Sequence, residues 1–116
     1  MINRNSTRYY SDLQEKAVAK TLGGKQNVNS GAGKWAKGDV VVPNASLLIE
    51  CKTFMTDKES VSIKKEWITK NRKESKEQHL LNSAVAFGFG PNPPYYYIID
   101  EALMTFLVEK LIEENV

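Results

Sequence analysis

Cysteine and histidine are scarce in this sequence. Cys51 is the one cysteine among 116 residues, so no disulfide can form within the chain. The one histidine, His79, cannot build a histidine-based metal site alone, and the sequence offers it no credible Ser–His–Asp arrangement. The absence of disulfides fits a protein of a reducing cytosol.

Long apolar runs and an excess of one charge are also missing. No apolar run approaches the roughly 20 residues that a membrane-spanning helix needs. The first residues, MINRNSTRYYSD, are polar and lack the apolar centre of a signal peptide. We therefore expect a cytoplasmic protein without a membrane partner. The net charge of +2 and pI of about 8.6 permit a nucleic-acid partner without identifying one.

The hydrophobic pattern predicts a single α/β domain over residues 1–116, in which helices flank a central mixed sheet. Pro43, Asn44 and Ala45 separate two apolar runs and predict an antiparallel hairpin. Residues 25–38 are polar and rich in glycine, which indicates a loop or an irregular edge strand. The predicted helices span about 7–22, 62–82 and 100–115, and the predicted strands span about 39–42, 46–54, 83–90 and 95–100.

Two acids stand in the predicted hairpin, where a buried strand seldom carries charge. If its strands pair, Asp39 and Glu50 approach one another, and two close carboxylates repel unless a positive charge separates them. A divalent cation that prefers hard oxygen ligands, Mg²⁺ or Mn²⁺, fits that need. Lys52 shares the face of Glu50, and Glu15 on the first helix can reach toward the same corner.

Three acids around a metal, with a lysine beside it, suggest hydrolysis of a phosphodiester. A simpler interpretation makes Glu50 and Lys52 a same-face surface ion pair and Asp39 a residue that flanks a turn. The spacing of acid, any residue and lysine is a weak pattern by itself. The residues alone leave both interpretations open.

Asp39, followed by Glu50-Cys51-Lys52 at the end of an apolar strand, resembles the PD-(D/E)XK nuclease superfamily. NSGAGKWAKGDVVV resembles the Ser-Gly-rich loop that precedes the metal-binding acid in archaeal-type Holliday junction resolvases, and LIECKT resembles their second motif. The resemblance covers about residues 10–55. Gly38 stands where the superfamily name has proline. The side chain at this position takes no part in the chemistry of the superfamily.

The resemblance implies a restriction-endonuclease-like αβββαβ core and a metal-dependent endonuclease that cuts four-way DNA junctions as a homodimer. It implies that Glu15, Asp39 and Glu50 are ligands of Mg²⁺ or Mn²⁺ and that Lys52 is the catalytic lysine. It also places Ser30 near the scissile strand. The small size is similar to that of phage or archaeal resolvases, which implies a prokaryotic, archaeal or phage-infected cell and a role in DNA recombination or repair.

The glycine-rich loop supplies the remaining candidates for DNA contact. Lys25, Lys34 and Lys37 lie near glycines that let backbone amides approach phosphates closely, although a solvated basic loop would have the same composition. Two alternatives to the resolvase remain. One is another nuclease on the same fold, of nicking, flap or restriction type, and the other is a non-catalytic DNA-binding module.

Overall fold

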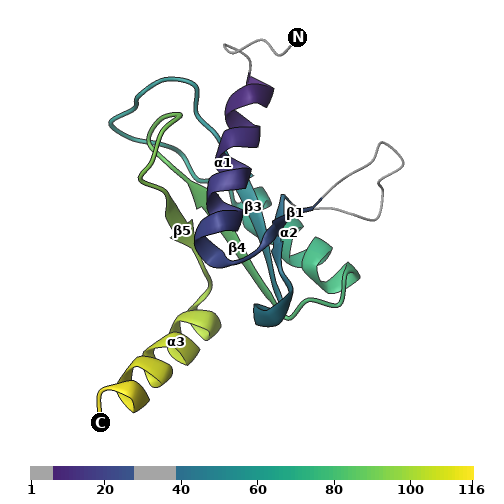
Figure 1. The fold of residues 1–116 in the computed structure, drawn as a ribbon, viewed down its shortest axis with the longest axis vertical. Coiled ribbons are helices and arrows are strands. Elements are labelled where there is room, and N and C mark those ends of the chain that lie inside the picture. The colour runs from purple at the N-terminus through teal and green to yellow at the C-terminus, as the bar shows by residue number, and fades with distance from the viewer. Residues whose placement is uncertain (1–6, 28–38) are drawn as a thin grey trace.

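The computed structural model describes residues 7–27 and 39–116. Their order is α1 (Thr7–Leu22), β1 (Lys25–Gln26), β2 (Val40–Val42), a short 3-10 turn (Pro43–Ala45), β3 (Leu47–Lys52), α2 (Lys65–Glu77), β4 (Asn82–Phe87), β5 (Tyr96–Ile98) and α3 (Glu101–Glu114). The predicted α/β class is confirmed at this level: one mixed sheet accompanies three helices (Figure 1).

The five strands lie in sequence order across the sheet. β1, β2 and β3 are antiparallel, β3 and β4 are parallel, and β5 returns antiparallel to β4. The predicted hairpin is confirmed, with Val40 opposite Ile49. The parallel step from β3 to β4 needs a crossover, which α2 provides.

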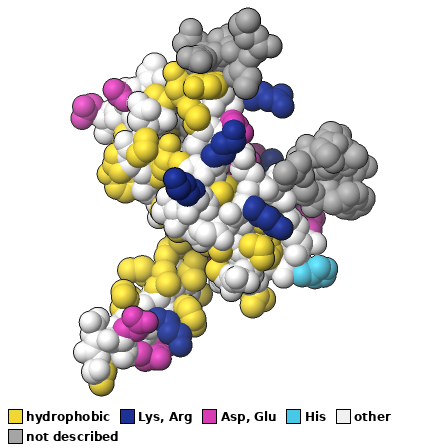
Figure 2. All heavy atoms as spheres, in the orientation of Figure 1, with side chains coloured by type: hydrophobic (Ala, Val, Ile, Leu, Met, Phe, Trp, Pro, Cys, Tyr) yellow, Lys and Arg dark blue, Asp and Glu magenta, His cyan; other side chains and the backbone are white. Residues whose placement is uncertain are grey.

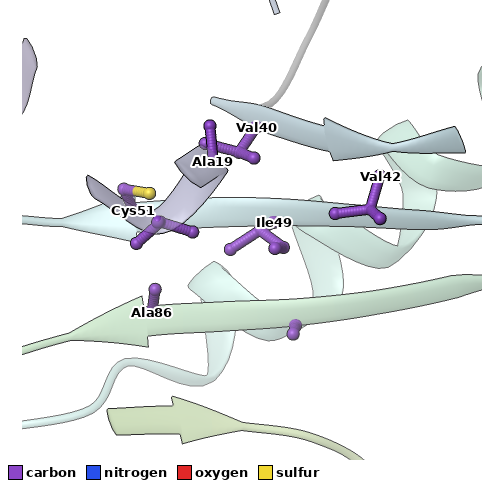
Figure 3. Packing of buried hydrophobic residues seen from close by; sticks show 8 residues of the cluster. Ala19, Val40, Val42, Ile49, Cys51 and Ala86 are labelled. Atoms are coloured by element: carbon purple, nitrogen blue, oxygen red, sulfur yellow. The ribbon is translucent and has the colours of Figure 1, made fainter. Parts of the chain in front are cut away.

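The core lies between α1 and one face of the sheet. Because successive strand residues point to opposite faces, Ile49 and Cys51 face α1, where Val18 and Ala19 cover them (Figure 3). Val40, Val42, Ala84 and Ala86 complete this cluster. Leu48 and Glu50 therefore point to the opposite face, where α2 lies. The core cluster under α1 thus lies on one face of the sheet, and Glu50 lies on the other face, where α2 also buries Leu48.

The ends of the helices show how local chemistry sets their bounds. Gly23 has a φ of +71°, and the N–H of Gly24 donates to the carbonyl of Ala19 at 2.8 Å, which ends α1 at Leu22, the predicted end of this helix. Asp100 caps α3, because its Oδ1 accepts from the N–H of Leu103 at 2.8 Å. The predicted helix 62–82 is shorter in the structure, where α2 begins at Lys65 and ends at Glu77.

Helix α3 leads away from the rest of the molecule (Figure 1). The predicted helices were expected to flank the sheet, yet α3, described over its full length, buries none of its residues. Its apolar side chains therefore remain available for another contact. No helix in the described part of the chain is long and apolar enough to span a membrane.

Candidate active site

The hairpin register brings Asp39 and Glu50 together. Val40 pairs with Ile49, so Asp39, one residue earlier, stands opposite Glu50, one residue later, and the N–H of Asp39 donates to the carbonyl of Ile49 at 3.1 Å. The carboxyl groups of Asp39 and Glu50 lie close enough that each alters the pKa of the other. The predicted approach of these two acids is therefore present in the structure.

Asp39 is held by the backbone of the neighbouring strand. Its Oδ2 accepts a hydrogen bond from the N–H of Cys51 at 2.7 Å. Burial raises the pKa of the Asp39 carboxyl above its ordinary value, and the charge of Glu15 raises it further, whereas the bond from Cys51 opposes the rise. The backbone thus aims the carboxylate at Glu50 while the surroundings make its negative charge costly.

Glu50 carries the largest shift among these carboxyls. Burial and the nearby charge of Asp39 raise its pKa from 4.5 to about 7, although the charges of Lys52 and Lys70 act in the opposite direction. The Glu50 side chain is 17% exposed, so solvent reaches it little. A pair of carboxyls that holds a proton near neutral pH is a site that a cation can occupy in the proton's place.

Lys52 stands beside this pair, as its position two residues after Glu50 predicts. Its Nζ lies 3.7 Å from Glu50 Oε2 and 5.0 Å from the centre of the Trp67 ring. An ammonium over an aromatic face is attracted by the electron density of the ring. Trp67 belongs to α2, so the helix and the strand together restrict where the Lys52 ammonium can lie.

Glu15 reaches the site from α1, on the other side of the sheet. Its Oε1 accepts from Gln26 Nε2 at 3.1 Å, and the same amide nitrogen donates to Asp12 Oδ1 at 3.0 Å. Burial raises the pKa of Glu15, and the charges of Asp12 and Glu50 add to the rise. Glu15 is thus close enough for its charge to be felt at Glu50, and Gln26 holds it at the edge of the sheet.

Within residues 7–27 and 39–116, no three His, Cys, Asp or Glu side chains are grouped closely enough to hold a metal ion. The structure brings Asp39 and Glu50 into contact and leaves Glu15 as a nearby separate charge. Two carboxylates still suit Mg²⁺, which proteins usually bind through one or two carboxylates, with water and substrate phosphate completing the shell. The role of Glu15 as a third ligand stays a prediction.

The DNA-contact residues fall mostly outside the described part of the chain. Ser30, Lys34 and Lys37 belong to residues 28–38, which lie outside it. Lys25 is described and exposed on the edge strand β1, which confirms that an edge strand precedes the hairpin. Its contact with DNA stays a prediction.

Cys51 faces the core, opposite the acids, as its position between Glu50 and Lys52 predicts. It is buried as a free thiol, 9% exposed, among the apolar residues under α1. Burial and the charges of Asp39, Glu15 and Glu50 raise its pKa. The thiol is therefore kept protonated, and this position contributes packing and its backbone N–H.

Sequence reasoning missed two buried amides that surround the site. Gln14 is 1% exposed; its Nε2 donates to the carbonyl of Ala86 at 3.3 Å, and its Oε1 accepts from the hydroxyl of Thr53. Asn71, also 1% exposed, donates to the carbonyls of Leu48 at 3.3 Å and Ala84 at 2.8 Å. Gln14 could have been found from the sequence, because it is a polar residue within an otherwise apolar face of the first helix.

Comparison of the chain with protein-family models, with curated proteins and with solved structures gives no match.

Proposed function

We propose that this chain is a metal-dependent DNA endonuclease of the Holliday junction resolvase type, built on a restriction-endonuclease-like core. One observation carries the proposal: the Asp39 and Glu50 carboxyls meet across the hairpin, with the Lys52 ammonium 3.7 Å from Glu50. An ion pair that only stabilises the surface has no need of a second carboxyl, whose charge raises the pKa of the first. This observation therefore favours the metal site over a simple surface ion pair of Glu50 and Lys52.

The donor set also supports a cation. Asp39 and Glu50 offer carboxylate oxygens only, which matches the preference of Mg²⁺ and Mn²⁺. A bound divalent cation supplies Lewis-acid polarisation of a phosphoryl oxygen and activates water at neutral pH. Glu15 adds negative charge at the edge of the same site.

The chain's own residues position and neutralise the substrate. Water attacks phosphorus and loses a proton to solvent, the phosphorus–oxygen bond to the leaving group breaks, and the leaving oxygen takes a proton from solvent. Lys52, held by Glu50 and Trp67, offers a fixed positive charge where negative charge grows on the phosphoryl oxygens. The Cys51 N–H holds Asp39 in place without taking part in the chemistry.

The acids argue for catalysis over simple DNA binding. Asp39, Glu50 and Glu15 place negative charge where a phosphate would come, which weakens DNA binding unless a cation intervenes. The substrate we propose is a branched four-way junction, cut by a homodimer on two opposed strands. Lys25, Lys34, Lys37 and Ser30 are the proposed phosphate contacts.

The test compares a labelled four-way junction with a linear duplex of the same arm sequence, both with Mg²⁺. We expect paired nicks in the junction, and Asp39→Asn and Lys52→Ala should each slow cleavage by about 100-fold or more. Asp57→Asn and Lys20→Ala are matched controls at exposed positions and should cut like the wild type. Binding to the junction in Ca²⁺ should persist in all four variants.

Each other outcome has a clear meaning. Equal cutting of the linear duplex would replace the resolvase by another nuclease on the same site. Junction binding without cleavage in Mg²⁺ or Mn²⁺ would favour the non-catalytic module. Full activity of Asp39→Asn would remove the carboxyl pair from the mechanism.

A further inference from the structure

Aromatic side chains gather at the end of β4 and the start of β5, beside the candidate site. The rings of Phe87, Phe89 and Tyr96 meet in all three pairs. Their centroids lie 5.6 Å apart for Phe87 and Phe89, 5.9 Å for Phe87 and Tyr96, and 5.7 Å for Phe89 and Tyr96. These separations are those of packed aromatic pairs, in which each ring restricts the orientation of the others. The three rings therefore form one fixed surface, the aromatic cluster.

The aromatic cluster lies on the face of the sheet that carries Glu50 and Lys52. Phe87 pairs with Lys52 on one side and with Tyr96 on the other. Side chains directly opposite one another on neighbouring strands point to the same face, so these three share the face of Glu50. Neighbouring strands lie about 4.8 Å apart, which puts the backbone of Tyr96 about 10 Å from that of Lys52. The cluster thus continues the candidate site across the sheet.

Two of the rings are open to a ligand. Phe89 is 39% exposed and Tyr96 is 47% exposed. A hollow of about 310 Å³ lies against both rings, and Pro93 and Pro94 add further apolar wall. Aromatic and proline rings are rigid, so a ligand that stacks on them loses little binding energy to ordering them. The surface therefore suits a flat ligand.

The backbone fixes the walls of this hollow. The N–H of Lys58, in the loop after β3, donates to the carbonyl of Phe89, in the loop after β4, at 2.7 Å. The Asp57 carboxylate packs against Gly90 so closely that a side chain at Gly90 would collide with it. The two loops therefore lie side by side (Figure 1), and Asp57, which also lines the hollow, joins them. The hollow is thus built before a ligand arrives.

Positive charge accompanies the rings. Lys52 stands opposite Phe87, and Lys58 lines the hollow, with its Nζ 5.8 Å from the centre of the Phe54 ring. A strand of nucleic acid offers a partner to both the rings and the lysines, because its bases have flat π faces and its phosphates are negative. An apolar segment of protein would use the rings and gain nothing from the two ammonium groups. The charges therefore favour a nucleic-acid strand as the occupant.

The rings suit a base that is not stacked in a duplex. Inside a duplex the neighbouring bases cover both faces of each base, and turning one out costs its stacking and pairing energy. That cost is least where a base is already unpaired, as in a single strand or at a distorted branch point. A strand that crosses the sheet from Lys52 therefore reaches the cluster most readily where its bases are unpaired.

We propose that Phe89 and Tyr96 stack on an unpaired base of the DNA strand whose phosphate lies at Lys52. The inference rests on the proposed nuclease function, and it names the feature of the substrate that the site reads, an unpaired base close to the cleaved bond. Stacking on a ring tolerates any base, so the contact reads the structure of the DNA and not its sequence. Phe87 positions the two exposed rings through its contacts with both.

The test measures binding of the full chain in Ca²⁺ to a short labelled oligothymidine and to an abasic strand of the same length. The two strands carry the same phosphates, so a difference in affinity reports the bases. We expect the wild type to bind the oligothymidine about 5- to 150-fold more tightly, which is the effect of stacking a base on an aromatic side chain. Phe89→Leu and Tyr96→Leu should each reduce this preference, and the double variant should bind both strands alike.

Two exposed aromatic residues elsewhere give matched controls. Tyr97, 38% exposed, is the next residue of β5, and its side chain points to the other face of the sheet. Phe106, 53% exposed, belongs to α3, the projecting helix that Figure 2 shows covered with hydrophobic side chains. Tyr97→Leu and Phe106→Leu should keep the preference for bases, and so should Tyr96→Phe, which retains a ring.

The wild type alone can overturn the inference, because equal binding of the two strands would leave no base contact to assign. A preference that survives both single ring variants, with the fold intact by circular dichroism, would also overturn it, as would an equal loss in Tyr97→Leu. If Tyr96→Leu changed the sedimenting mass of the chain and kept the preference, the cluster would be a protein contact instead.

Failure of the proposed function is a separate result. Preference for bases without cleavage of the junction in Mg²⁺ would remove the nuclease and leave the stacking site. Cleavage of the junction by a chain that binds both strands alike would keep the nuclease and remove the stacking site.

Discussion

Asp39 Oδ2 accepts a hydrogen bond from the backbone N–H of Cys51 at 2.7 Å. Asp39 precedes Val40, the first residue of β2, so this bond from a side chain extends the contact between β2 and β3 by one residue. It therefore fixes the carboxyl of Asp39 beside that of Glu50 before any ligand arrives. Because the fold holds these two negative charges together, their repulsion should lower the stability of the metal-free protein.

Glu50 makes the metal-free protein less stable at higher pH. Its pKa in the folded chain is about 7, above the ordinary 4.5, so the folded state binds its proton more tightly than the unfolded state. The resulting stabilisation is complete below about pH 4.5 and is lost as the pH rises through 7. Chemical denaturation with a chelator should show a fall of up to about 3 kcal/mol in the free energy of unfolding between pH 5 and pH 8.

Glu50→Gln cannot ionise, so its free energy of unfolding should change much less over the same range. At pH 8 this variant should be more stable than the wild type, because the repulsion from Asp39 is gone. Glu77→Gln, an exposed position on α2, is the matched control and should follow the wild type. An unchanged pH dependence in Glu50→Gln would show that another group carries it.

A divalent cation should stabilise the wild type at pH 8. At this pH most Glu50 carboxyls are ionised, and a cation that Asp39 and Glu50 would hold in the folded state only would add about 2.7 kcal/mol at a concentration 100 times its Kd. Thermal unfolding with and without Ca²⁺ measures the effect without any DNA. Asp39→Asn should lose most of the increase in Tm, whereas Asp57→Asn should keep it. Equal increases in both would place the cation elsewhere.

The hairpin and the acid pair could be predicted from the sequence because their signals are local. Pro43 and Asn44 mark the turn, and once the register follows from it, Asp39 and Glu50 must be neighbours. Gly23 and Asp100 likewise set the ends of α1 and α3 through their own backbone or side chain.

What could not be predicted depends on contacts between distant segments. The predicted start of α2 at about residue 62 was wrong because Lys64 occupies the cap position, and Lys64 makes no side-chain bond that would mark it in sequence. The cation–aromatic contact of Lys52 with Trp67 joins a strand to a helix. The last helix was expected to flank the sheet, but α3 buries none of its residues, since periodicity shows that a face is apolar without showing which surface covers it.

Trp67 should act on cleavage through Lys52. Trp67→Leu removes the aromatic face that attracts the ammonium, a contact of about 0.5–2 kcal/mol, so we expect cleavage about 2- to 30-fold slower. Trp67→Phe keeps a ring and should lose less. Single-turnover rates on the four-way junction in Mg²⁺ give the comparison, and junction binding in Ca²⁺ should be alike in both. Equal rates for the two variants would assign Trp67 to packing alone.

Asn71 should contribute to stability by joining β3 to β4. Its side chain donates to the carbonyls of Leu48 and Ala84, and Asn71→Leu leaves both without that donor in a buried setting. We expect a loss of about 2–4 kcal/mol in the free energy of unfolding, measured by urea denaturation. Asn92→Leu, at an exposed position, is the matched control and should cost little. An unchanged free energy of unfolding in Asn71→Leu would mean that α2 packs on the sheet equally well without the amide.

Gln14 and Thr53 couple α1 to the chain directly after Lys52. The Thr53 hydroxyl donates to Gln14 Oε1, and Gln14 Nε2 donates to the carbonyl of Ala86, so one buried side chain joins three segments. Gln14→Met and Thr53→Val should each lower the free energy of unfolding by about 1–3 kcal/mol. Because each variant breaks the same bond, the double variant should cost less than the two single losses added, by about 1 kcal/mol. Urea denaturation of the wild type, the two single variants and the double variant measures this coupling. Strict additivity would show that the two side chains act independently, and the segment after Lys52 would then owe its position to other contacts.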